Sequence, residues 1–176
     1  MPDPSVGSGV RRSPRFEEAV GDVVSSAVPH ADLDALKASL DLVRLSTRWV
    51  HHLEHVVHRP AGWSFSGFRI MFCVWAMGEL EPREIARLSG LTRATISSAL
   101  NKLEDDGLIT RSRDHDDGRL VTVRLTDDGR RRLADAYAHQ NQLEAEFFGA
   151  LPDSGQAFRG AAANLLASPL PEPPRG

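Results

Sequence analysis

The sequence contains one cysteine and no apolar run long enough to cross a membrane. Cys73 cannot form an intrachain disulfide and matches no zinc-ligand spacing. It lies in the apolar run FRIMFCVWAM, so we interpret it as a small packed hydrophobe rather than a redox sensor. A membrane helix needs about 20 consecutive apolar residues, and no run here approaches that length. The N-terminal arginines are not followed by an apolar segment, so we expect no secretory signal and a cytoplasmic protein with no membrane partner.

Strong positive charge is also absent. The net charge is −3, and only Lys37 and Lys102 are lysines among 21 basic residues. A protein that coats nucleic acid or anionic lipid without specificity carries a large positive charge, so the composition argues against that class. The sequence also contains no nucleophile elbow, phosphate-binding loop or complete metal site, which makes an enzyme the least favoured function and predicts no cofactor.

Apolar residues recur at helical spacing over most of the chain. This periodicity predicts helices over 16–27, 32–58, 64–77, 80–89, 92–105, 126–151 and 154–167. The helix at 64–77 is apolar on nearly all sides and is therefore expected in the core. We expect Phe158, Ala162, Leu165 and Leu166 of the last helix to face inward. From Leu108 the period becomes two, and LITRSR and RLVTVRLT are joined by the polar link DHDDG, which predicts a two-stranded hairpin.

The stretch GLTRATISSALNKLEDDGLI has an unusual helix surface. Ile96, Leu100 and Leu103 form an apolar stripe, and the other faces carry short hydroxyl and amide groups together with Arg93. Gly90 can supply the positive φ that a tight turn after the preceding helix requires. A helix that enters the DNA major groove offers such short polar groups to bases and phosphates. A merely solvated helix face is the alternative interpretation.

Helix, tight turn, helix and hairpin follow one another in the order of a winged helix-turn-helix. The fold class predicted is mainly α with a small two-stranded β-wing, and long N- and C-terminal helices flank it. Between Gly78 and Leu133 there are eleven basic and eleven acidic residues. DNA binding by this segment therefore requires arginines on the DNA side and acidic clusters on the opposite side, and affinity should fall steeply with salt.

From about Leu33 to Leu151 the chain resembles MarR-type transcriptional regulators. The segments that carry the resemblance are EIARLSGLTRATISSALNKLEDDGLITR and RDHDDGRLVTVRLTDDGRRRL. The resemblance implies that Arg119 enters the minor groove and that Asp117 orients nearby basic groups. Gly118 departs from the family pattern, which usually has a basic residue there. The DNA-contacting set expected is Thr92, Arg93, Ala94, Thr95, Ser97, Ser98, Asn101, Lys102, Arg113, Asp117 and Arg119.

The resemblance also implies a homodimer that binds a palindromic operator in double-stranded DNA. We expect the first and last helices to form the interface, through Phe16, Val20, Leu36, Phe147, Phe158 and Leu165. The expected organisation is a disordered segment at 1–15, dimerisation and core helices at 16–77, a DNA-binding lobe at 78–126, C-terminal dimerisation helices at 127–167 and a disordered tail at 168–176.

A small aromatic or lipophilic effector is expected between the dimerisation helices and the DNA-binding lobe. The ligand-contacting candidates are Trp49, His52, Trp63, Phe68, Phe72 and Trp75, with core packing as the alternative for each. The leading hypothesis is a homodimeric, sequence-specific repressor that such an effector releases from DNA.

Two alternatives to this hypothesis remain open. The first is a winged-helix module that binds protein instead of DNA. The second is a metal-responsive regulator, because HHLEHVVH places His51, His55 and His58 at the spacing of one helical face. No second ligand cluster completes that site, so no metal is predicted.

Overall fold

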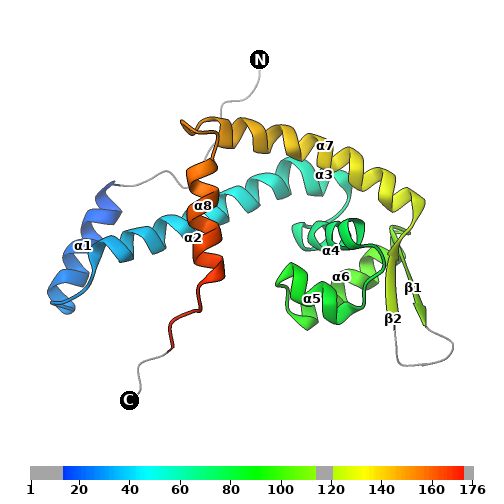
Figure 1. Ribbon diagram of the computed structural model, residues 1–176, viewed down its shortest axis with the longest axis horizontal. Coiled ribbons are helices and arrows are strands. Elements are labelled where there is room, and N and C mark those ends of the chain that lie inside the picture. Colours follow the sequence, from blue (N-terminus) through cyan, green and yellow to red (C-terminus); the bar gives the residue numbers. More distant parts are fainter. Residues whose placement is uncertain (1–13, 114–120, 173–176) are drawn as a thin grey trace.

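The structure is a computed structural model that describes residues 14–113 and 121–172. Within these residues the chain is mainly helical and carries one two-stranded antiparallel sheet (Figure 1). The helical elements are α1 (Pro14–Ala27), α2 (Leu33–Leu53), the π-helical turn η1 (Glu54–His58), α3 (Arg59–Ala61), α4 (Phe65–Met77), α5 (Pro82–Ser89), α6 (Arg93–Asp105), α7 (Asp127–Gly149) and α8 (Gln156–Ala167). The strands are β1 (Ile109–Arg113) and β2 (Val121–Leu125).

The molecule is elongated, with its two ends joined by the long helices α2 and α7 (Figure 1). Helices α4, α5 and α6 and the two strands gather at one end, α1 lies at the other, and α8 crosses α2 between them in this view. The Trp49 ring on α2 stacks on Phe147 of α7 with 4.4 Å between centroids, so the two long helices are packed together. The predicted order of helices and hairpin is confirmed, and α1 begins at Pro14, two residues before the expected start.

The helix predicted at 32–58 is not a regular α-helix along its whole length. The Asp32 carboxylate caps it by accepting from the amides of Asp34 and Ala35. At Glu54–His58 it widens into η1 and continues as α3, until Gly62 ends it at φ 97°. A π-helical turn contains more residues than an α-helical turn. The side chains after it therefore point in other directions than α-helical periodicity predicts.

This rotation makes the predicted histidine face wrong. His58 is fully buried, whereas His51 and His55 are exposed. The His58 ring packs on Phe68 at 4.5 Å between centroids, and neither ring nitrogen has a hydrogen-bond partner among the residues that the structure describes. Burial lowers the pKa of His58 to about 4, although the nearby Glu54 carboxylate opposes the shift.

The core of the molecule surrounds α4. Its apolar members are Trp63, Phe68, Ile70, Met71, Val74, Leu80, Ile85, Ile96, Leu100, Leu103, Leu108, Ile109, Val123, Leu125 and Leu133. The prediction of a buried helix is confirmed except at its last turn, where Met77 is 64% exposed. Cys73 is half-buried, and burial raises the pKa of its thiol, which favours the protonated form.

Helix α8 corrects the sequence analysis. Phe158, Leu165 and Leu166 were expected to face inward, but they are 42%, 71% and 87% exposed. In the view of Figure 1 the helix crosses α2 between α1 and the lobe, and within the described part of the chain these side chains stay open to solvent. Periodicity locates an apolar face without showing what it packs against. No helix within 14–113 and 121–172 is long and apolar enough to span a bilayer.

Candidate nucleic-acid interface

Helix α5 and the turn after it set the angle of α6. A capping box joins Glu81 and Glu84 at the start of α5, and Pro82 occupies its first turn. Gly90 ends the helix at φ 65°, a conformation that glycine adopts without a steric penalty. The predicted turn is therefore confirmed.

Helix α6 begins at an N-cap threonine and buries one stripe. The Thr92 hydroxyl accepts from the Thr95 amide at 3.2 Å, and the two hydroxyls lie 2.8 Å apart. Ile96, Leu100 and Leu103 are each 2% exposed, as predicted. The opposite sides are open to solvent. They carry Arg93, Ala94, Ser97, Ser98, Asn101 and Lys102, all exposed, and Thr95, which is half-buried. The N-terminal part of α6 thus presents a mainly polar surface of small side chains together with Arg93.

The acidic end of α6 is largely neutralised by basic partners. Lys102 pairs with Asp106 at 3.1 Å, so one predicted DNA contact is tethered to an acidic group. Glu104 binds Arg111 of β1 through its side chain and also accepts the Arg111 amide. The Arg111 hydrogen bonds lower the pKa of Glu104. These contacts attach the first strand to α6 and remove much of the local negative field.

The wing is fixed to the end of α6 and to the start of α7. The strands pair with Ile109 opposite Leu125, and Leu80 adds a bridge to Val123. The Thr126 hydroxyl donates to the Gly107 carbonyl at 2.8 Å and accepts from the Gly129 amide at 2.9 Å. A Cβ on Gly129 would lie 2.0 Å from the Leu108 oxygen, so only glycine fits there. The Leu-Thr-x-x-Gly segment is therefore a backbone-to-backbone junction.

The predicted wing contacts are only partly described. Arg113 is the last residue of β1, and its side chain lies outside the described part of the chain. Asp117 and Arg119, and with them Gly118, fall in 114–120, which is also outside it. Their roles in DNA binding stay predictions.

The structure adds two arginines that the sequence analysis did not select. Arg83 of α5 and Arg111 of β1 join Arg93 and Ser97 around a recess of about 340 Å³. Arg111 belongs to a strand and Arg83 to another helix, so helical periodicity on α6 gave no signal for them. Arg83 pairs with Glu81 at 2.7 Å and Arg111 pairs with Glu104, so of the three arginines around this recess two already have acidic partners.

The six ligand-contacting candidates do not meet in one cavity. Trp49 and His52 stack on each other at 6.0 Å between centroids, near α7. Phe68, Phe72 and Trp75 form a row of ring contacts inside the lobe. Trp63 lines a separate, larger cavity beside α6. Among the described residues no group of three histidine, cysteine or acidic side chains has the arrangement of a metal site.

Comparison with known proteins shows which family has this arrangement of helices and strands. Residues 63–121 match the MarR family. The HTH-type transcriptional regulator YwaE of Bacillus subtilis (strain 168), itself uncharacterised, is 31% identical over 129 residues, which are 73% of this chain and 75% of YwaE. The chain belongs to the MarR family. It is a transcriptional regulator with the winged-helix fold of that family.

Two further relatives of this MarR regulator are informative. The HTH-type transcriptional repressor YetL of Bacillus subtilis (strain 168) is 31% identical over 115 residues, covering 63% of this chain and 68% of YetL. A solved structure of BpsR from Bordetella bronchiseptica superposes with a TM-score of 0.64 at 23% identity, over 74% of this chain and 96% of the other. That work concerns regulation of BpsR DNA binding by 6-hydroxynicotinic acid.

Proposed function

We propose that this MarR regulator is a homodimeric, sequence-specific DNA-binding repressor that a small-molecule effector releases from its operator. The observation that carries the proposal is α6, which buries its apolar stripe and leaves a mainly polar surface of small side chains exposed between Thr92 and Lys102. That surface would enter the major groove, with Arg93 positioned for a guanine edge. Helix α6 is backed by the rigid junction at Gly129, so its orientation relative to the wing is fixed.

The proposed interface uses apolar surface that one chain leaves open. Besides α8, exposed apolar side chains lie on α1 and α2, namely Phe16, Val23, Leu42 and Val43, at 49–67% exposure. Contiguous apolar surface on a soluble protein marks an interaction site. A two-fold dimer through these helices would present two α6 helices to grooves about 34 Å apart. Of the interface residues expected from sequence, Phe147 also packs on Trp49 within the chain.

Repression and effector release are supported by the relatives. YetL is a repressor, and BpsR responds to an organic acid in its binding of DNA. In the proposed mechanism the effector shifts the population away from dimers whose α6 spacing matches DNA. The ligand-contacting candidates Trp49, His52, Trp63, Phe68, Phe72 and Trp75 remain those of the sequence analysis.

Fluorescence anisotropy with the DNA upstream of its own coding sequence tests the proposal. We expect tight binding that weakens steeply as salt rises from about 50 to 200 mM, because Arg and Lys contacts release counterions. Arg93→Ala should lose affinity, whereas Arg48→Ala on the exposed surface of α2 should not. Failure of the unmodified protein to bind any DNA would favour a winged-helix module that binds protein.

A further inference from the structure

The long helix that runs from α2 into α3 changes its winding at η1. The amide of Arg59 donates to the carbonyl of Glu54, five residues back, whereas an α-helix uses the carbonyl four residues back. Pro60 gives a reason, because a proline ring inside an α-helix clashes with the carbonyl four residues earlier, here that of Val56. A wider turn carries that carbonyl away from the ring, so we attribute η1 to Pro60 and not to the residues within it.

The π-turn leaves His58 in an unfavourable place. Its ring is completely buried against the rings of Phe65 and Phe68, at 5.3 and 4.5 Å between centroids. Both ring nitrogens lack a hydrogen-bond partner in the part of the chain that the structure describes. A buried polar group without a partner destabilises the conformation that contains it. A second conformation that gives these nitrogens a ligand therefore competes with the π-turn.

Four metal-binding side chains share one face when the segment HHLEHVVH is wound as an α-helix. Side chains three, four and seven residues apart lie on the same side of such a helix. Counted from His51, these positions are Glu54, His55 and His58. In the π-turn the set is broken, because His51 and His55 are exposed while His58 faces the core. Imidazole nitrogens together with a carboxylate oxygen are ligands that Zn²⁺ takes in its four-coordinate sites.

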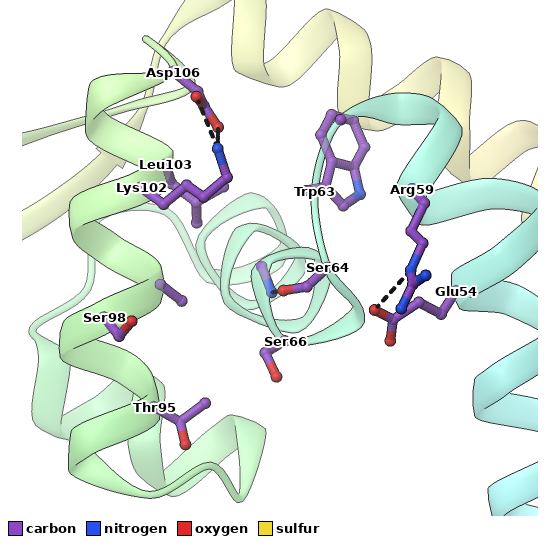
Figure 2. Close-up of a pocket in the computed structure, with 13 residues that line it drawn as sticks. Glu54, Arg59, Trp63, Ser64, Ser66, Thr95, Ser98, Lys102, Leu103 and Asp106 are labelled. Carbon is purple, nitrogen blue, oxygen red and sulfur yellow. Dashed lines mark hydrogen bonds and ion pairs between the residues drawn. The ribbon is translucent and has the colours of Figure 1, made fainter.

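Few contacts oppose the change of winding. Glu54 forms an ion pair with Arg59 at 3.6 Å (Figure 2), and the arginine side chain is 73% exposed, so the pair contributes little. After η1 the helix continues only through the short α3, which ends at Gly62 with φ 97°. Helix α4 has its own N-cap, because the Ser64 hydroxyl accepts from an amide in the first turn at 3.1 Å. The link at Gly62 can therefore absorb a shift of register while α4 keeps its place.

We propose that the segment of η1 becomes a Zn²⁺ site when it is wound as an α-helix, and that the metal selects this winding. The ligands are then the imidazoles of His51, His55 and His58 and the carboxylate of Glu54. The π-turn and the α-turn are two states of one segment, and Zn²⁺ favours the second because only that state brings its ligands together. Binding withdraws His58 from α4 and so loosens the joint between the long helix and the lobe. The metal site does not depend on the DNA-binding role proposed above.

The histidine ring resonances show which side chains the metal takes. The full-length ¹⁵N-labelled protein is titrated with ZnCl₂ near neutral pH, with MgCl₂ as control because Mg²⁺ prefers oxygen ligands. Single His→Gln changes at 51, 55 and 58 assign the three sets of ring resonances. We expect Zn²⁺ to shift all three sets and Mg²⁺ to shift none. A shift at 51 and 55 without one at 58 means that His58 stays buried, and it overturns the proposal, as does the absence of any shift.

Two exposed histidines offer a matched pair of variants. His55→Gln removes the central ligand and should weaken Zn²⁺ binding about tenfold or more in calorimetry, since even changes around metal ligands have effects of that size. His52→Gln alters an exposed neighbour outside the proposed face and should bind within about threefold of the unmodified protein. Neither change touches the core, so both variants should keep the Tm of the unmodified protein. Equal affinities of the two variants place the metal elsewhere and overturn the proposal.

Pro60 allows a test of the winding itself. Pro60→Ala removes the clash with the Val56 carbonyl, so the α-helical state becomes more populated before metal is added. The apparent Kd for Zn²⁺ should fall about threefold or more, because a larger fraction of the protein is competent to bind. Pro29→Ala, in the exposed turn between α1 and α2, serves as control and should leave that Kd unchanged. An unchanged or higher Kd for Pro60→Ala shows that the π-turn does not limit binding and overturns the proposal.

Discussion

The lobe around α4 and α6 is closed by its own chain, whereas the region of α1, α2 and α8 is not. Ile85, Leu108 and Val123 are completely buried in the lobe. Leu165 and Leu166 of α8 are mostly exposed, although both belong to an apolar helix face. Full burial of such a side chain contributes about 1.5–3 kcal/mol, so the helical region leaves much of its stabilisation unused in a single chain. The lobe therefore has a complete core of its own, whereas the helices carry apolar side chains that the proposed dimer would cover.

The largest expected loss of stability comes from a substitution at Gly129, where α7 packs against the backbone of Leu108. Gly129→Ala places a Cβ 2.0 Å from the Leu108 oxygen and 2.9 Å from its carbonyl carbon, both backbone atoms. The helix must move, and we expect unfolding free energy to fall by more than about 3 kcal/mol. Gly149→Ala, near the other end of α7, meets no atom within 4 Å and should change stability by less than about 1 kcal/mol. Urea denaturation measures both, and equal effects would disprove the backbone clash.

A pair of leucines tests the comparison itself. Leu100→Ala removes a side chain that is 2% exposed, and should cost about 3 kcal/mol at every protein concentration. Leu165→Ala removes a 71% exposed side chain, and should lower stability only where dimers form. Denaturation at two protein concentrations, with light scattering for mass, distinguishes them. A loss at Leu165 that does not depend on concentration would mean that α8 packs within its own chain.

Acid should destabilise the molecule through His58, at the boundary of the two regions. Its pKa is about 4 when folded and near 6.5 when unfolded, so the unfolded state gains a proton first. The stability is complete above about pH 6.5 and is lost as the pH falls towards 4; at pH 5 the loss is about 2 kcal/mol. His58→Leu should remove this part of the pH dependence. His55→Leu, at an exposed position, should retain it; identical pH profiles for the two variants would count against the assignment.

The smallest expected effect on stability is at Lys102. Its pair with Asp106 is 70% exposed on the lysine side, so Lys102→Met should change unfolding free energy by less than about 0.5 kcal/mol. If Lys102 contacts a phosphate, the plot of log affinity against log salt should become shallower by about one unit. Lys37→Met, which breaks the similar pair with Asp34 on α2, should leave that slope unchanged. An unaltered slope for both variants would remove Lys102 from the DNA-contacting set.

The sequence was sufficient to predict those features that depend on interactions between residues close together along the chain. The helix starts expected at Asp32, Ser64 and Thr126 are N-caps in the structure, where a hydroxyl or carboxylate accepts from amides two or three residues ahead. The α6 stripe was readable because helical geometry repeats every 3.6 residues. The polar surface of α6 follows from the same geometry, because the residues of α6 that do not belong to the apolar stripe remain exposed to solvent.

Other features needed the folded chain. A π-turn requires one extra residue in a helix, and periodicity gave no sign that it would turn His58 inward and leave His55 outside. The recess around Arg83 and Arg111, and the cavity that joins Trp63 to α6, each combine residues from separate elements. Their distances depend on how the helices cross, which no single segment contains.

The amino-acid order alone determined the succession of helices and hairpin, the buried stripe of α6, the tight turn at Gly90 and the family of the protein. These depend on interactions within a few residues, which are the same wherever the segment is placed. Tertiary structure alone decided which apolar faces are covered, which histidine is buried and which hydrogen-bond donors lie beside α6. Burial is a property of several segments together, so it appears only once they have packed.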